Sequence, residues 1–100
     1  SNINVGDGGV LRNTQTGTQS DLTLGFNGRG DLTIVGDGLV DIYDDVIFGQ
    51  NAGGVGIAEL TADSELRVNR NGSGSNVFVG LSGTGVVTMS GSSTLTVGND

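Results

Sequence analysis

Apolar and polar residues alternate with a period of two over much of the chain. Between residues 30 and 42, for example, Thr33 separates Leu32 from Ile34, and Asp41 separates Val40 from Ile42. This alternation is typical of β-strands with one buried face, and it does not match the 3.6-residue period of a helix. Abundant Gly and β-branched residues also disfavour helices. We therefore expect no helices, and short strands near residues 22–25, 31–35 and 39–43, separated by turns.

The alternating pattern recurs along the chain. Residues 30–42, 56–68 and 85–97 align without a gap, at offsets of 26 and 29 residues. A small residue occupies the same place in each copy, as Gly36, Ala62 and Gly91. Four columns of apolar residues also coincide, and we expect them to form the core: Leu32/Ala58/Val87, Ile34/Leu60/Met89, Val40/Leu66/Leu95 and Ile42/Val68/Val97.

A shorter segment with the pattern Φ-x-Φ-Gly, where Φ is apolar, precedes each copy, at residues 22–25, 46–49 and 77–80. The stretch Asn2–Gly6 (Asn-Ile-Asn-Val-Gly) matches Asn76–Gly80 (Asn-Val-Phe-Val-Gly), which predicts a partial first copy with the same starting strand. The register of residues 7–21 stays open. We expect one module with coils at residues 2–20, 21–44, 45–75 and 76–100. We also expect it to be a segment of a longer chain or filament, because it starts without Met and ends within the pattern.

Two all-β architectures are compatible with short alternating strands. An antiparallel sandwich or barrel would join neighbouring strands by hairpins and would give no reason for matching columns. In a parallel β-solenoid, each inward side chain packs on its equivalent about 4.8 Å along the axis, which requires matching columns. Repeats of this length are also typical of solenoids and propellers. We therefore predict an all-β parallel β-solenoid (β-helix) of about four three-strand coils.

The best-formed repeat, residues 76–98, resembles a known group of sequences. Asn-Val-Phe-Val-Gly-Leu-Ser-Gly-Thr-Gly-Val-Val-Thr-Met-Ser-Gly-Ser-Ser-Thr-Leu-Thr-Val-Gly is similar to the repeats of bacterial autotransporter (type V secretion) passengers and PEP-CTERM-associated proteins. The match is close at 76–98, fair at 21–43 and weaker at 45–68, where Ala62-Asp-Ser replaces a glycine pair. The resemblance implies a parallel β-helix at a bacterial surface, acting as a stalk or fibre and carrying no catalytic residues.

The composition excludes several classes of chemistry and partner. The chain has no Cys, His or Lys, so thiolate and imidazole metal sites, a His general base and a Lys Schiff base are absent. A formal net charge of −7 disfavours nucleic acids and anionic lipid surfaces, and no apolar run is long enough to enter a bilayer as a span. We expect a protein that is not an enzyme and that is extracellular or on a bacterial cell surface.

Charged residues share columns at the same 26-residue offset. Asp41 aligns with Arg67, and Asp44 with Arg70, so stacked coils would form two ion pairs on one exposed face. Such pairs contribute about 0.2–1 kcal/mol each and set register more than stability. The alternative is that this cluster belongs to a carbohydrate-binding or polysaccharide-cleaving module.

The residues that start the Φ-x-Φ-Gly segments are Asn2, Asp21, Asp45 and Asn76. Asx side chains at such places commonly accept hydrogen bonds from backbone N–H groups. Stacking would also bring Asp21 and Asp45 within about 5 Å of each other, where a Ca²⁺ ion could bridge them. We expect no cofactor, with Asp21 and Asp45 as a weak calcium candidate.

The expected function follows from the ends of the predicted solenoid. End coils leave unpaired backbone groups and an apolar cross-section, which are templates for further strands. Stacking that does not close on itself produces a filament. We expect a structural building block of a surface fibre, stalk or adhesin, whose partners are copies of itself or adjoining repeats, head to tail, and a host or surface glycan.

Overall fold

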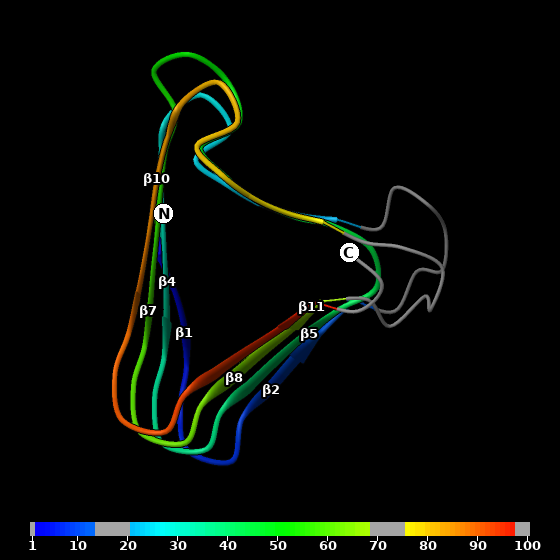
Figure 1. The fold of residues 1–100 in the computed structure, drawn as a ribbon, viewed down its shortest axis with the longest axis vertical. Helices are drawn as coiled ribbons and strands as arrows, with labels where there is room; N and C mark the ends of the chain where they lie inside the picture. The colour runs from blue at the N-terminus through cyan, green and yellow to red at the C-terminus, as the bar shows by residue number, and fades with distance from the viewer. Residues whose placement is uncertain (1, 14–20, 69–75, 98–100) are drawn as a thin grey trace.

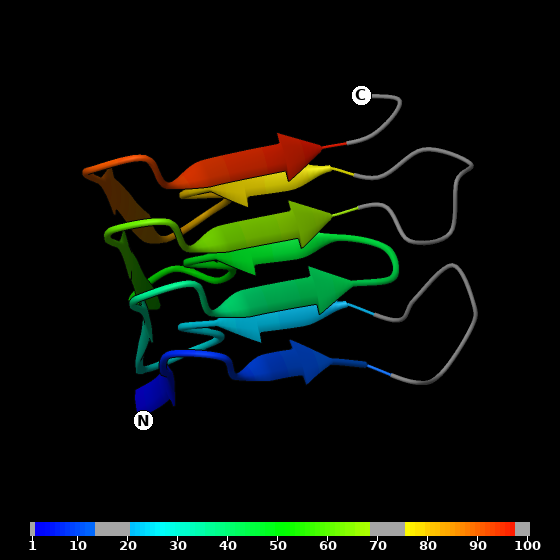
Figure 2. The same ribbon diagram turned by 90° about the horizontal axis from the view of Figure 1, so that it is seen from below.

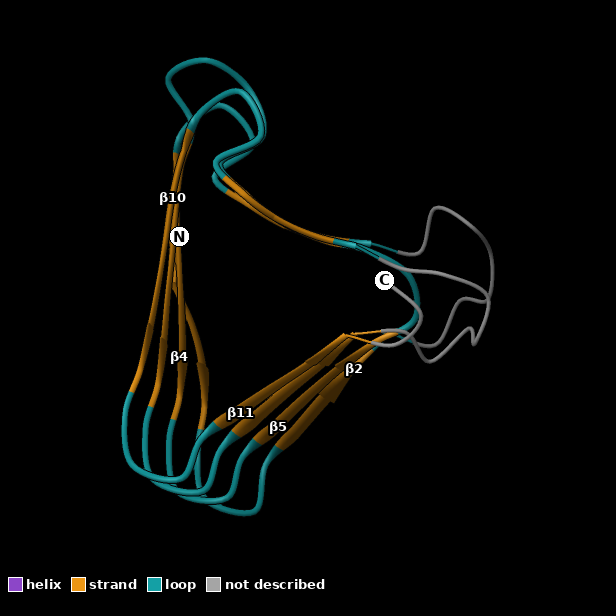
Figure 3. Cartoon of the chain, viewed as in Figure 1, coloured by secondary structure: helices purple, strands orange, loops and turns teal. Residues whose placement is uncertain are grey.

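A computed structural model describes residues 2–13, 21–68 and 76–97, and these residues form strands and turns without a helix (Figure 3). No membrane-crossing helix is therefore found in this part of the chain. Its strands, in chain order, are β1 (Asn2–Val5), β2 (Val10–Arg12), β3 (Leu22–Leu24), β4 (Arg29–Ile34), β5 (Leu39–Ile42), β6 (Val46–Phe48), β7 (Val55–Leu60), β8 (Glu65–Val68), β9 (Val77–Val79), β10 (Thr84–Met89) and β11 (Thr94–Val97).

These strands form three sheets, and every pairing is parallel. Sheet A has the order β1-β4-β7-β10, sheet B has β2-β5-β8-β11, and sheet C has β3-β6-β9. The chain visits sheets A, B and C in turn, and each strand pairs with the strand three places further on. Equivalent strands run side by side in the same direction, slightly offset from one another (Figure 1), and the side view shows them in successive layers from the N-terminus to the C-terminus (Figure 2). The all-β parallel class is confirmed, and the antiparallel alternative is wrong.

The register of the sheets brings equivalent repeat positions together. Leu32 lies opposite Ala58, which lies opposite Val87, and the same holds for Ile34, Leu60 and Met89. In sheet B the corresponding sets are Val40, Leu66 and Leu95, and Ile42, Val68 and Val97.

The core lies between the three sheets, where the inward side chains of the middle layers meet. Ile34, Val40, Phe48, Leu60 and Leu66 are each 0% exposed. Burying an apolar side chain of this size contributes about 1.5–3 kcal/mol. The sheets are thus held together by columns of stacked apolar residues.

The first strand departs from the sequence prediction. Asn2 lies opposite Asp31 in sheet A, and not in sheet C with Asn76 as the Asn-Ile-Asn-Val-Gly match predicted. A four-residue alternating stretch fits either sheet, and the turn that follows it decides between them. The N–H of Gly9 donates to the carbonyl of Gly6, as that of Gly38 donates to Val35, so the first strand precedes the turn that joins sheets A and B. The first described layer therefore begins in sheet A.

The small-residue column lies at the turn between sheets A and B. Gly36, Ala62 and Gly91 have φ angles of 61°, 59° and 68°, in the left-handed region. Each follows a residue whose carbonyl accepts a hydrogen bond from the N–H three residues later. The left-handed region suits Gly, and Ala62 is the one residue other than Gly that adopts it in the described ranges.

The glycine that begins each aligned window has a packing role. A Cβ atom on Gly56 would lie 2.8 Å from both the Cα of Phe48 and the N of Gly49, atoms of strand β6 and the residue after it. Sheets A and C therefore approach each other too closely for a side chain at this corner. Gly30 and Gly85 occupy the same column, which explains the recurrence of Gly at this position.

Candidate functional site

The C-terminal end of the stack exposes residues that are buried in the layer before it. Met89 of β10 is 41% exposed, whereas Leu60, its partner in the same column, is 0% exposed. Val79 of β9 is 49% exposed, and Phe48 opposite it is 0% exposed. We call this surface, formed by the outer edges of β9, β10 and β11, the C-terminal end.

The C-terminal end also differs in charge and hydrogen bonding from the rest of the molecule. Residues 76–97 contain no Asp, Glu, Lys or Arg, so the charged residues of the described chain all lie in earlier layers. Among the described strands, β9, β10 and β11 are the last of their sheets, and each pairs with a described strand on one side. Their outer N–H and C=O groups are arranged as the next parallel strand would require.

The N-terminal end is more closed. Val5 shares its column with Ile34, Leu60 and Met89 and is 7% exposed, and Leu24 of β3 is 4% exposed. The two ends of the stack are therefore different surfaces.

An acidic corner lies where strands β3 and β6 begin. Carboxylate oxygens of Asp21, Asp44 and Asp45 lie within 4.8 Å of one another. The N–H of Asp45 donates to Oδ1 of Asp21 over 3.0 Å, and the N–H of Asn76 donates to Oδ1 of Asp45 over 2.8 Å. Each Asx side chain thus accepts a hydrogen bond from the backbone of the next layer, the capping role that the sequence suggested as one of two alternatives.

The charges of this corner act on Asp21. Partial burial raises the pKa of Asp21, and the nearby carboxylates of Asp45 and Asp44 raise it further, while the hydrogen bond from the Asp45 N–H opposes the shift. Acidic clusters of this kind occur without a metal, so the grouping does not by itself make a calcium site.

The predicted ion pairs take a different form. Asp41 lies opposite Arg67 as expected, but its carboxylate Oδ2 is 2.9 Å from Nε of Arg12, on the other neighbouring strand. Arg67 is paired with Glu65 on its own strand, at 3.2 Å. The second predicted pair, Asp44 with Arg70, cannot be placed, because Arg70 lies outside the described residues.

The expectation that these acids lie on an exposed face is wrong. Asp41 is 2% exposed and Asp44 is 5% exposed. Sequence reasoning missed Arg12 because the register of residues 7–21 was open. The turn at residues 6–9 would have fixed this register, since it places Val10–Arg12 opposite Leu39–Asp41 and therefore Arg12 opposite Asp41.

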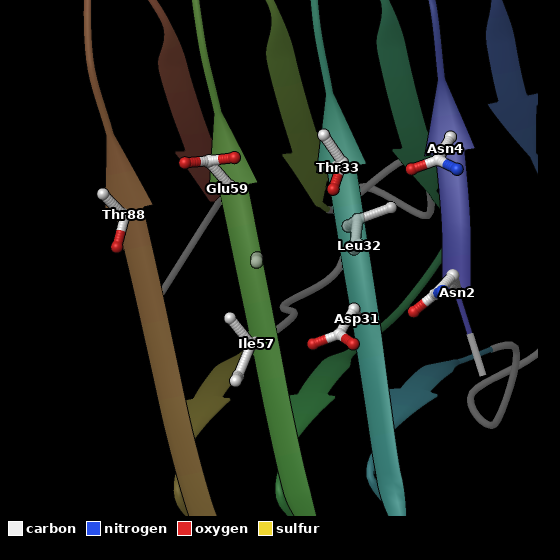
Figure 4. Close-up of a pocket in the computed structure, with 9 residues that line it drawn as sticks. Asn2, Asn4, Asp31, Leu32, Thr33, Ile57, Glu59 and Thr88 are labelled. Carbon is white, nitrogen blue, oxygen red and sulfur yellow. The ribbon is translucent and has the colours of Figure 1, made fainter.

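A shallow hollow of about 370 Å³ lies over the outer face of sheet A and was not anticipated from the sequence. Outward side chains of neighbouring strands form two rows across it (Figure 4). One row runs through Asn4, Thr33, Glu59 and Thr88, and the other through Asn2, Asp31 and Ile57. The rows offer hydrogen-bonding groups at the spacing of adjacent strands.

The C-terminal end, the acidic corner and the hollow are all formed by residues of this one chain. Comparisons with protein-family models, with curated protein sequences and with solved structures found no match to this chain.

Proposed function

We propose that this protein is a β-solenoid building block of an extracellular fibre or stalk, and that it extends by stacking head to tail on itself or on adjoining repeats. The observation that carries the proposal is the open C-terminal end, where Met89 is 41% exposed although Leu60 beneath it is 0% exposed. A further layer would bury Met89 as β10 buries Leu60.

The N-terminal strands of a second copy fit this surface in register. Ile3 lies opposite Leu32, in the column that ends at Val87, and Leu11 lies opposite Val40, in the column that ends at Leu95. Stacking β1 and β2 of one copy on β10 and β11 of another therefore places apolar residues on apolar residues. The two ends differ, so this contact is heterologous and continues indefinitely, which produces a filament.

Charge supports the same arrangement. A net charge of −7 would oppose close association if the charges met at the contact. Residues 76–97 carry no charge, so the C-terminal end presents a neutral surface to the next copy, and the acidic side chains lie in the layers below it.

The remaining parts of the proposal rest on composition and on resemblance. A chain rich in Gly, Thr, Ser and Asn, without Cys or Lys, suits an exported bacterial surface protein, and its repeats resemble those of autotransporter passengers. We propose no catalytic role and no cofactor.

Paired substitutions on one strand test the stacking contact. Met89→Lys places a charge in the inward column of the end layer, whereas Thr88→Lys places the same charge on the neighbouring outward position, opposite Glu59. Light scattering over a concentration series should show growing assemblies for the wild type and for Thr88→Lys, and monomers for Met89→Lys. Equal behaviour of the two variants would contradict stacking through the C-terminal end.

The hollow on sheet A supports a second candidate, a carbohydrate-binding module. Its rows of amide, hydroxyl and carboxylate groups could hydrogen-bond a polyhydroxylated ligand lying across the strands. Glycan binding should then be lost in Thr33→Val and Glu59→Ala and kept in Asp44→Ala, because Asp44 does not line the hollow. Unchanged affinity in the first two variants would remove this candidate.

A further inference from the structure

The three sheets do not end at the same height. Within the described residues, sheets A and B each contain four strands, and sheet C contains three. The chain visits the sheets in the order A, B, C, so the position that follows β11 along the path lies over β9. Within the described residues this position, one strand wide, holds no strand.

The backbone of β9 is already arranged to receive a strand there. In the layer below, the N–H of Val46 donates to the carbonyl of Asn76, and the N–H of Gly80 donates to the carbonyl of Phe48. The equivalent groups one layer further on are the N–H of Val77 and the carbonyl of Val79. Both face the position over β9, because β9 is the last strand of sheet C within the described ranges.

The side chains around this position define what would fill it. The inward column that begins with Leu24 and Phe48 ends at Val79, which is 49% exposed. Exposed Leu81 lies just beyond β9, also at 49%. Asn76 is the equivalent, in the β9 layer, of Asp21 and Asp45. The side chain of each of these two acids accepts a hydrogen bond from a backbone N–H of the next layer. An incoming segment therefore needs two apolar residues two positions apart, and a backbone N–H just before them.

The incoming segment also needs a Gly after its second apolar residue. Gly25, Gly49 and Gly80 follow the three strands of sheet C, with φ angles of 75°, 77° and 81°. An L side chain is disfavoured at such angles. The sequence pattern that fits is Φ-x-Φ-Gly, which is the pattern of the sheet C strands themselves.

We propose that the edge of β9 binds an extended Φ-x-Φ-Gly segment of another polypeptide chain, which adds to sheet C as its fourth parallel strand. The inference deepens the proposed function and rests on it, since the added strand completes the layer on which the next copy stacks. Backbone hydrogen bonds hold the segment, and the apolar side chains of Val77 and Val79 select it.

A peptide binding experiment tests this site directly. The probe is a fluorescent acetylated peptide with the sequence of residues 21–27, Asp-Leu-Thr-Leu-Gly-Phe-Asn, and its controls are a scrambled peptide and one with Ala in place of the Gly. Fluorescence anisotropy should show saturable binding of the first peptide, binding at least about fivefold weaker for the Ala peptide, and none for the scrambled one.

Two protein variants locate the binding. Val79→Lys puts a charge under the second apolar residue of the peptide at a half-exposed position, and Val77→Pro removes the N–H that faces the open edge. Both should abolish binding, and Thr88→Lys, on the outer face of sheet A, should leave it unchanged. Binding that survives Val79→Lys would overturn the proposed site. Val77→Pro tests the backbone hydrogen bond separately, and binding that survives this change would also overturn the site.

Electron microscopy of the wild type without peptide separates this inference from the function it extends. Rods together with specific peptide binding support both. Rods without peptide binding overturn the strand site and leave the stacking function standing. Peptide binding without rods overturns the stacking function and leaves the strand site standing. If neither rods nor peptide binding is seen, the strand site and the stacking function are both overturned.

Discussion

The guanidinium Nε of Arg12 lies 2.9 Å from Oδ2 of Asp41, and it reaches across from strand β2 to a carboxylate whose side chain is 3% exposed. Arg12 is itself half exposed, so it covers the acid from the solvent side. Removing one member of such a pair leaves the other charge in a poorly hydrated place.

We therefore expect Arg12→Met to lower the free energy of unfolding by about 1–3 kcal/mol, because the buried carboxylate loses a charged hydrogen-bond donor. Urea denaturation followed by circular dichroism measures it. Arg67→Met is the matched control, since Arg67 pairs with Glu65 near the surface and such pairs contribute about 0–1 kcal/mol. A larger loss in Arg67→Met than in Arg12→Met would contradict this assignment.

The acidic corner predicts a pH-dependent effect of Asp21→Asn. The raised pKa of Asp21 means that the folded protein binds this proton more tightly than the unfolded chain, so ionisation of Asp21 destabilises the fold. Asn keeps the Oδ1 acceptor for the Asp45 N–H and removes the charge. At pH 7 we expect Asp21→Asn to raise Tm by about 1–3 °C.

The gain should disappear as the pH falls below the ordinary Asp value of 3.8, where Asp21 is protonated in both the folded and the unfolded chain. Thermal unfolding at several pH values checks this. The same experiment in excess Ca²⁺ and in chelator distinguishes the calcium alternative. If Ca²⁺ bridges Asp21 and Asp45, the wild type is stabilised by the ion and Asp21→Asn becomes the less stable protein.

The left-handed Ala62 offers a stabilising substitution. An L residue in this region is less stable than Gly by about 1 kcal/mol, and Gly36 and Gly91 fill the same place in the neighbouring layers. We expect Ala62→Gly to raise the free energy of unfolding by about 0.5–1 kcal/mol. Ala52→Gly, at an exposed loop position without a positive φ, should be neutral or slightly destabilising. Equal effects of the two changes would show that the turn geometry is not the cause.

The corner between sheets A and C predicts the opposite outcome for another glycine. Gly56→Ala would bring a methyl group to 2.8 Å from backbone atoms of Phe48 and Gly49, so the sheets would have to separate. A loss of about 1–3 kcal/mol or more is expected from such overpacking. Gly28→Ala is the control, because a Cβ atom on Gly28 would have no neighbour within 4 Å and its φ is not left-handed. A tolerated Gly56→Ala would contradict the close approach of the sheets.

Much of the fold was predictable because the core residues recur in columns. Leu32, Ala58 and Val87 could be aligned from the sequence alone, and the parallel register places them side by side. The signal is strong because every inward position must match its neighbours in two layers. Some strand ends differ from the predicted ones by a few residues. Strand β4, for example, begins at Arg29, whereas the sequence predicted a start near residue 31.

The first layer and the charged residues were harder to predict. Asn2–Val5 alternates like a strand of sheet C but lies in sheet A. The sequence did not predict this, because four alternating residues carry no information about which sheet they join. Asp41 occupies an outward position, which predicts exposure, yet Arg12 covers it. Burial of an outward side chain depends on its partner in a neighbouring layer, and the alternation of the strand does not encode that partner.

In the proposed assembly, parallel stacking continues beyond a single copy of the polypeptide. X-ray fibre diffraction of concentrated, aligned protein measures this stacking. We expect a meridional reflection at about 4.8 Å, since the strands lie across the fibre axis and successive layers stack along it. A preparation that stays monomeric at every concentration and gives no oriented reflection at that spacing would contradict it.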